Sequence, residues 1–408
     1  METELLYALR DPAGIPSHPV IFLVLGVLTF ALHIAAVQMM LGASTLTLWG
    51  AFSRDAHRRR LAQSMINVAK VMVSVAIVLG VAPLLFVQVI YDPFWYTANV
   101  LSAWWVIGFI LILLVGYTLM YVFYWRNHHL ADTARKPSCP GAMVASIALL
   151  LVVGFIMHVL SQQMLQPEQW MSWYAPNGDL ETRGTALHAF HPWRFLFFIS
   201  LSAPVTGALL VAYQRYFRAR DDVEPAYLDW VRDLAYRLIN VGGVVALVLG
   251  AVWMATLPEA VAGFAFSPWV WVSAAGLLGF VGFAHWVRGK GNSPWAYAVL
   301  GVGTVAIILV AVAREALRWA KLHGVHGYNA LDYPINMDWY STLTFFVTFG
   351  VMGAGVLAYY LTVAWRAGQT QGVYTASAVV DRMGNIAIAM LVLWIVHYFV
   401  LGFVWWAL

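Results

Sequence analysis

The chain has 408 residues, of which 62 % are hydrophobic and only 10 % are charged, against about 25 % charged residues in a typical soluble domain. Its formal net charge of +4 comes from basic residues scattered through short polar segments, without a stripe interleaved with aromatic side chains, so the composition excludes a nucleic-acid-binding protein. Cys139 is the only cysteine, which excludes an internal disulfide, a CxxCH haem attachment and a cysteine-ligated cluster.

Apolar segments of about 20 residues or more recur along the whole chain, and each is long enough to cross a hydrocarbon core about 30 Å thick. The pattern predicts an all-α fold, a polytopic membrane helix bundle with about ten transmembrane helices. The first apolar segment is too long for a signal peptide and is interpreted as a retained span. We expect spans at residues 19–50, 62–91, 99–126, 141–165, 192–217, 234–256, 268–288, 294–318, 339–366 and 380–406.

Basic residues gather in alternate connections, those that follow the first, third, fifth, seventh and ninth spans. The positive-inside rule therefore predicts that these connections are cytoplasmic and that both termini lie outside. The basic residues are Arg54, Arg58, Arg59, Arg60, Arg126, Arg135, Lys136, Arg215, Arg218, Arg220, Arg232, Arg288, Lys290, Arg366 and Arg382.

Two long connections, residues 166–193 and 319–338, lie on the predicted outer side. Both are rich in aromatic residues, and they contain His188, His191 and His323 together with His326. Long loops on one face are where partners dock and function concentrates. Since the sequence has no low-complexity tract and no soluble domain, residues 1–408 are predicted to form one transmembrane helical domain.

His33 lies deep in the first predicted span and is a candidate metal-binding residue, because ionisable groups inside a membrane are costly. Imidazole is a good ligand for haem iron. The neighbouring residues are small, which lets a flat macrocycle approach the backbone: Ala31, Ala35, Ala36 and Gly42. A structural histidine that hydrogen-bonds to a neighbouring helix is the alternative, and position in the helix does not separate the two.

Glu315 lies at the outer end of the eighth predicted span, between Arg314 and Arg318. The three groups form an ion-pair cluster near the interface in one interpretation. In the other, Glu315 ligates a metal while an arginine holds a haem propionate through charge-assisted pairing. His158 in the fourth span and His397 in the tenth are further candidate axial ligands, although the pattern favours interpreting each of them as a packing residue.

Five short segments also follow one another in a defined order. They are His33 with IAAVQMMLG, then GVAPLLFVQVIYDPFWYTANV, SQQMLQPEQW, VTGALL and finally Glu315-Ala-Leu-Arg318-Trp319. This series resembles subunit I of the cytochrome bd oxidase superfamily over roughly residues 1–320, with two further helices in 339–408. In that family a first-helix histidine and the glutamate of an E-x-x-R-Q-P-W segment ligate haem iron. The resemblance therefore implies that His33 and Glu315 ligate one or two b-type haems, with Arg314 and Arg318 at the propionates.

Other family features have no counterpart here. The histidine that ligates the low-spin haem falls at Phe197 or Phe198, and its methionine partner falls near Ala274. The quinol-binding loop after the sixth span is reduced to about a dozen residues, and the proton-feeding glutamates of the third span fall near Gly108 and Gly116. These departures argue against quinol oxidase activity.

The sequence thus predicts a haem-binding membrane subunit of a respiratory, bd-like oxidoreductase in the bacterial cytoplasmic (inner) membrane. We expect it to associate with other membrane-embedded subunits and to exchange electrons with a separate c-type cytochrome at the outer face. A haem-free membrane anchor or scaffold and a quinol-interacting membrane anchor of an oxidoreductase are the alternatives.

Overall fold

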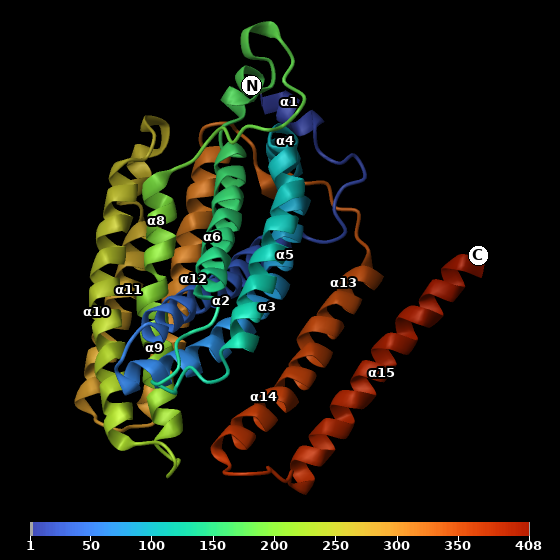
Figure 1. Ribbon diagram of the computed structural model, residues 1–408. Helices are drawn as coiled ribbons and strands as arrows, with labels where there is room; N and C mark the ends of the chain where they lie inside the picture. Colours follow the sequence, from blue (N-terminus) through green and yellow to red (C-terminus); the bar gives the residue numbers. More distant parts are fainter. Residues whose placement is uncertain (1–2, 408) are drawn as a thin grey trace. The chain divides into compact units, whose positions relative to one another are not determined.

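The computed structural model describes residues 3–407, and the regular elements found there are all helical, apart from an isolated bridge between Ile15 and Ile335 (Figure 1). Ten helical segments in this range are long and apolar enough to cross a membrane, which confirms the predicted all-α architecture with about ten spans. Contacts group the chain into two compact units. The first contains residues 3–12, 19–215 and 225–333, and the second contains residues 13–18, 216–224 and 334–407.

The first unit holds eight of the ten candidate spans in the described chain. Its helices are α1 (Thr3–Ala8), α2 (Pro19–Ala51), α3 (Ala56–Ile90), α4 (Asp92–Leu101), α5 (Ala103–Arg126), α6 (Pro140–Gln163), α7 (Trp170–Tyr174), α8 (Pro192–Ser200), α9 (Ser202–Phe217), α10 (Pro225–Ala255), α11 (Pro268–Gly289) and α12 (Trp295–Leu322). Short 3₁₀ turns occupy Pro167–Gln169, Pro176–Gly178, Glu259–Phe266 and Ala330–Asp332. Helices α8 and α9 together form one span.

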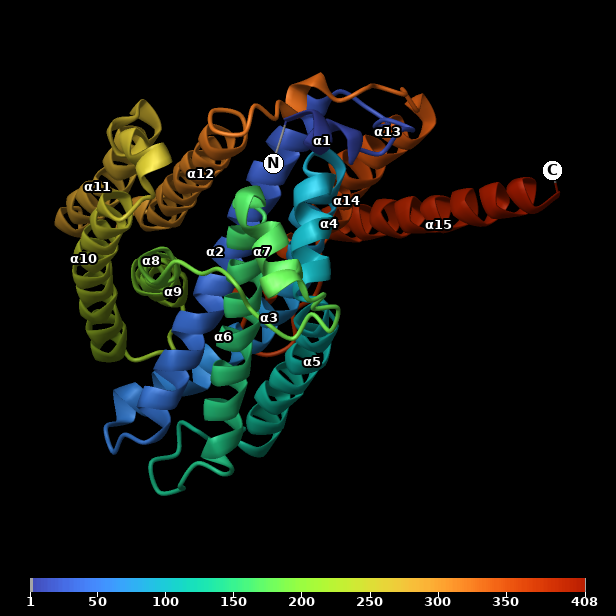
Figure 2. The ribbon, with the colours of Figure 1, turned by 90° about the horizontal axis from the view of Figure 1, so that it is seen from above.

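Helix α2 is the central helix of this unit, since α3, α6 and α12 all contact it (Figure 2). Small residues allow the close approach. Gly42 of α2 faces Thr206 of α9 with no room for a Cβ atom, and a Cβ atom at Gly242 of α10 would lie 2.6 Å from Pro204 Cδ. Without a hydrophobic driving force between helices in lipid, such close contacts supply much of the packing energy.

Two helices begin well before the predicted spans. Helix α3 starts at Ala56, where the Asp55 carboxylate accepts a hydrogen bond from the Arg58 backbone N–H, and α10 starts at Pro225. A hydropathy window leaves such charged first turns out of the predicted span. The helix nevertheless includes them, because their long charged side chains can extend to polar surroundings. The predicted third span, 99–126, is interrupted at Ser102, whose hydroxyl donates to Gln163 Oε1 at 3.0 Å and lies 2.8 Å from Ala186 O.

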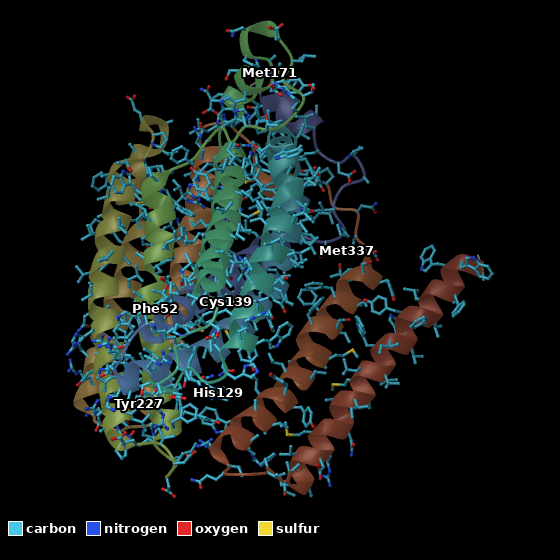
Figure 3. The ribbon with its side chains drawn as sticks, in the orientation of Figure 1. Phe52, His129, Cys139, Met171, Tyr227 and Met337 are labelled. Carbon is cyan, nitrogen blue, oxygen red and sulfur yellow. The ribbon has the colours of Figure 1, made fainter. Side chains whose placement is uncertain are left out.

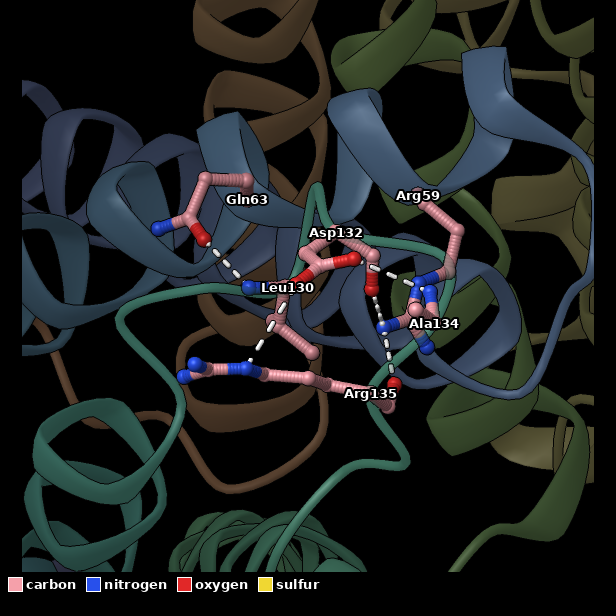
Figure 4. A network of polar contacts seen from close by, with 6 residues as sticks. All are labelled: Arg59, Gln63, Leu130, Asp132, Ala134 and Arg135. Atoms are coloured by element: carbon pink, nitrogen blue, oxygen red, sulfur yellow. Dashed lines mark hydrogen bonds and ion pairs between the residues drawn. The ribbon is translucent and has the colours of Figure 1, made fainter.

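One buried arginine organises the connection between α5 and α6 (Figure 4). The Arg59 guanidinium is 3 % exposed and donates to the backbone carbonyl oxygens of Ala51, Asp132 and Arg135 at 2.5–2.7 Å. Beside it, Gln63 Oε1 accepts a hydrogen bond of 2.7 Å from the Leu130 backbone N–H. These bonds hold an otherwise irregular loop against the start of α3.

The second unit contains α13 (Trp339–Phe346), a π-helical turn (Val347–Met352), α14 (Gly353–Gln369) and α15 (Ala378–Ala407). The first three elements form one candidate span and α15 forms another. Residues 13–18 pair with the segment before α13, through Ile15 N–H to Pro334 O at 2.9 Å and Asn336 N–H to Ile15 O at 2.9 Å.

Candidate functional site

A cavity of about 480 Å³ lies inside the first unit, within the size range of sites for organic ligands. Its wall is formed mostly by apolar side chains from α2, α3, α5, α6, α8 and α12. The ionisable or polar groups that line it include five of the six residues singled out in the sequence, and Arg194 in addition. The five are His33, His158, Arg314, Glu315 and Arg318.

His33 is held by α3. Its Nδ1 lies 2.9 Å from Ala76 O, so Nδ1 carries the proton and donates it to this carbonyl. The other ring nitrogen, Nε2, has no recorded hydrogen bond within residues 3–407. A histidine fixed by Nδ1–H to a backbone carbonyl, with Nε2 left as an acceptor, is the arrangement that metal-ligating histidines adopt.

Gly80 makes room for the imidazole. A Cβ atom at this position would lie 2.9 Å from both Cε1 and Nδ1 of His33. The Nδ1–Cε1 edge of the ring therefore faces the backbone of α3 at Gly80, one turn beyond the carbonyl that it binds. Pro83, which interrupts the hydrogen bonding of the same helix, also lines the cavity.

Glu315 has partners for both carboxylate oxygens. Oε1 accepts a hydrogen bond of 3.0 Å from the Tyr91 hydroxyl, and Oε2 lies 2.8 Å from Arg318 Nη1 and 3.7 Å from Arg314 Nη1. Glu315 and Arg318 are buried, with exposures of 9 % and 8 %. The ion-pair cluster predicted from the sequence is therefore present, and any metal ligation by Glu315 requires it to share or release one of these partners.

Arg194, at the start of α8, is the site residue that sequence reasoning missed. Its guanidinium is 8 % exposed, and Nη1 lies 2.7 Å from His158 Nδ1 and 3.2 Å from Ser161 Oγ. The same guanidinium lies over the Phe198 ring, while Arg314 lies 3.9 Å over Phe30. A signal was available, because Arg194 falls inside the predicted fifth span, where a charge is costly.

Several polar atoms in the cavity wall are buried without a hydrogen-bond partner in the described chain. They are Arg314 Nε and Trp95 Nε1, which are donors, and Gln38 Oε1, which is an acceptor. An unpaired buried donor or acceptor costs about 1–3 kcal/mol. Together with the apolar walls, these atoms are typical of a site that is completed by a ligand with polar groups.

His397 does not belong to this cluster. It lies on α15 in the second unit, and its Nε2 is 2.6 Å from the Tyr340 hydroxyl. Phe197 and Phe198, the positions to which the sequence resemblance assigns the low-spin haem histidine, belong to an aromatic group, since both contact Trp253, at ring-centroid distances of 5.6 and 6.1 Å.

Residues 164–191, which connect α6 to α8 and carry Met171, form a folded cap at one end of the first unit (Figure 3). Glu168 pairs with Lys321 at 3.3 Å, and the His188 ring stacks on Trp173 at 5.1 Å. Burial lowers the pKa of His188 and of His326 below the usual histidine range, which favours their neutral forms. Met171, Leu180 and Phe190 remain largely exposed on this cap.

Comparison with known proteins gives one structural match. The structure of bd oxidase from Geobacillus thermodenitrificans superposes with a TM-score of 0.58 over 91 % of this chain and 99 % of that chain, at 12 % sequence identity. The chain has a bd-oxidase-like fold. This agrees with the resemblance read from the ordered segments, although the identity shows the fold alone. No protein-family model matches the sequence, and no curated protein matches it either.

Proposed function

We propose that this bd-oxidase-like chain is a haem-binding membrane subunit of a respiratory electron-transfer complex. The observation that carries the proposal is the His33 imidazole, anchored through Nδ1–H to Ala76 O in the wall of the cavity, with Nε2 uncommitted. A b-type haem bound there supplies a one-electron redox centre, whose potential depends on the water-excluding apolar walls and on the charges around it.

The charge of the cavity wall supports a dianionic occupant. Three guanidinium groups, those of Arg194, Arg314 and Arg318, line the cavity together with a single carboxylate, Glu315, which leaves two positive charges in excess. A b-type haem carries two propionate groups, and guanidinium groups bind carboxylates through short, charge-assisted hydrogen bonds. We therefore assign Arg314 and Arg318 to propionate binding, with Arg314 Nε still lacking a partner.

Glu315 is the second candidate iron ligand, but its two oxygens already have partners, which favours one haem rather than two. In this proposal Glu315 holds the neighbouring guanidinium groups in place and neutralises part of their positive charge. His158, whose two ring nitrogens both have neighbours within hydrogen-bond distance, is a wall residue and not an axial ligand.

The electron partner proposed is a separate c-type cytochrome at the outer face, since the chain has no CxxCH motif of its own. The exposed Met171, Leu180 and Phe190 on the cap, beside Glu168 and Glu181, are suitable for a transient docking surface. Other membrane-embedded subunits and a bacterial inner-membrane location complete the proposal. Quinol oxidation is not part of it, because Phe197 and Phe198 stand where the family's haem-ligating histidine is expected.

The test is a haem assay on the purified chain and two histidine variants. We expect wild type to contain protohaem, with a reduced-minus-oxidised spectrum of a b-type centre. H33A should lose the haem ligated by His33, whereas H397A should keep it, because His397 lies on a different unit and bonds to Tyr340. Absence of protohaem from wild type, or equal haem content in H33A and wild type, would contradict the proposal.

A haem-free scaffold is the second candidate function, and the complete set of partners around Glu315 favours it. In that case iron is absent from wild type and from H33A alike. The third candidate, a quinol-interacting anchor, predicts saturable binding of a quinone analogue by the haem-free protein, which our proposal does not.

A further inference from the structure

Arg194 is a buried cation without a carboxylate partner. No ion pair is recorded for it among residues 3–407, whereas Arg314 and Arg318 share Glu315. Breaking or omitting one partner of a buried ion pair is costly, because the remaining charge stays desolvated. An arginine held in this state in the wall of a ligand-sized cavity is available to bind a negative group.

The contact between Arg194 and His158 is also incomplete, because both groups are donors. His158 Nε2 accepts a hydrogen bond of 2.9 Å from the His191 backbone N–H, so in the neutral ring the proton must reside on Nδ1. That Nδ1 lies 2.7 Å from Arg194 Nη1, and a guanidinium has donors only. Arg194 Nη1 can donate to Ser161 Oγ at 3.2 Å, but the His158 Nδ1–H faces the guanidinium and not an acceptor.

The opposite tautomer does not remove the conflict. With the proton on Nε2, His158 can accept from Arg194, but its Nε2–H then faces the His191 backbone N–H. A backbone N–H at the start of α8 is fixed, whereas an arginine side chain can turn. Ser161 does not supply the missing acceptor for His158, since its hydroxyl donates to His158 O at 2.7 Å and its oxygen lies beside Arg194.

We propose that Arg194 and His158 Nδ1–H together bind one carboxylate group inside the cavity. One carboxylate oxygen accepts from both donors, and the second oxygen faces the remaining guanidinium N–H groups. This assignment rests on the proposed function where the carboxylate would be a haem propionate other than the one assigned to Arg314 and Arg318. A free small carboxylate has the same chemistry, and the experiment distinguishes these two sources.

The first arm compares protohaem with its dimethyl ester, which has the same ring and iron but no carboxylate. Haem-free full-length protein from haem-limited cells is titrated with each compound and followed by absorbance. We expect wild type to bind protohaem about 10- to 100-fold more tightly than the ester, because the ester cannot form the charge-assisted hydrogen bonds of the carboxylates. In R194Q this preference should fall about tenfold, while R194K should retain part of it.

The matched control is R183Q. Arg183 lies on the exposed cap, paired with Glu181 at 3.0 Å and 79 % exposed, so this variant should keep the wild-type preference. Because a His158 variant could change the packing of α6, H158Q is used beside H158F. Glutamine can accept from the His191 N–H and donate to the carboxylate, so it should restore part of the preference that phenylalanine loses.

The second arm uses acetate on the haem-free protein, with chloride at equal ionic strength as reference. If the carboxylate is a free anion, acetate raises the unfolding temperature of wild type and R183Q but not that of R194Q. The protein could bind neither haem compound and still be stabilised by acetate in wild type but not in R194Q. That result would support the carboxylate subsite and contradict the proposed haem-binding function. If R194Q and R194K match wild type in both arms, the carboxylate subsite is wrong, whatever the outcome of the haem assay.

Discussion

At the residue scale, the imidazole of His33 is fixed on two sides. Ala76 O sets its tautomer, and Gly80 gives it space against α3. A ligating ring that is held in this way loses little freedom when it binds a metal, since its orientation is already set by the protein. Gly80 therefore affects the position of the His33 ring, and this effect can be measured separately from the stability of the helix.

Replacing Gly80 by alanine should weaken haem binding without destabilising the fold. The new Cβ atom would meet the His33 ring at 2.9 Å, so the imidazole must turn or shift. Alanine is favoured over glycine inside a helix by up to about 1 kcal/mol, which offsets the strain in the fold itself. We expect haem affinity to fall at least tenfold while the unfolding temperature of the haem-free protein changes by only a few degrees.

The control for this variant is G108A, because Gly108 on α5 has no other atom within 4 Å of a built Cβ. Haem content and spectrum should be unchanged there. A G80A protein with the wild-type haem affinity and spectrum would show that the ring does not depend on this space.

Asp92 gives a prediction about pH. Its carboxyl group is 6 % exposed, and burial raises its pKa above the usual range, opposed by hydrogen bonds from the Tyr333 hydroxyl at 2.7 Å and the Asp11 N–H at 3.0 Å. Between the unfolded pKa, about 3.9, and the raised folded pKa, the folded state holds a proton that the unfolded state has released. Stability therefore falls as pH rises through this window.

The measurement is the unfolding temperature of wild type and D92N between pH 4 and pH 7. The decline attributable to Asp92 should be present in wild type and absent from D92N. Y333F removes a donor that lowers the pKa of Asp92, so it should steepen the decline. Identical pH profiles for wild type and D92N would exclude Asp92 as the group responsible.

At the element scale, the α5–α6 connection depends on Arg59. R59M removes three hydrogen bonds to backbone carbonyls and leaves those oxygens without their partner. Hydrogen bonds to charged groups contribute about 1.5–3 kcal/mol each, so a loss of about 3 kcal/mol or more in stability is expected. Limited proteolysis should then cut within residues 127–139.

The matched control is R58M on the same turn of α3. Arg58 lies 4.6 Å over the Trp49 ring, a contact worth about 0.5–1 kcal/mol at an exposed site, so its removal should leave the loop resistant to protease. Equal effects of the two substitutions would mean that charge in this region matters more than the carbonyl contacts of Arg59.

Hydropathy predicted the number of long helices but not where several of them begin or break. A hydropathy average over a window of residues detects only the apolar, lipid-facing part of each helix. The start of α3 therefore falls outside the predicted span, because Arg58, Arg59 and Arg60 make that turn polar. The break at Ser102 depends on Gln163 and Ala186, which are distant in sequence. Local patterns carry no information about such partners.

The same reasoning explains the candidate site. His33, Glu315, Arg314, Arg318 and His158 were each recognisable as costly groups inside predicted spans, and the fold brings these five to one cavity. Which groups pair could not be derived from spacing. The bond from Tyr91 to Glu315 and the contact of Arg194 with His158 join different helices, and His397 carried the same sequence signal but lies in the second unit.

At the scale of the whole molecule, the orientation in the membrane is a prediction that the single cysteine can test. Cys139 is exposed and lies at the start of α6, in a connection made basic by Arg135 and Lys136. Figure 3 shows it well below Met171, which lies at the top of the view and is 66 % exposed. The positive-inside rule predicts that Cys139 is cytoplasmic and that both termini lie outside.

A membrane-impermeant maleimide should therefore label wild type in inside-out vesicles but not in intact spheroplasts. A C139S/M171C protein should give the reverse result, because Met171 lies on the cap that is predicted to face outward. C139S alone, which has no cysteine, measures the background. Labelling of Cys139 in intact spheroplasts would invert the topology, and it would put the exposed apolar side chains of the cap on the cytoplasmic side. No outer-face c-type cytochrome could then dock there, so the orientation decides between that partner and a cytoplasmic electron donor.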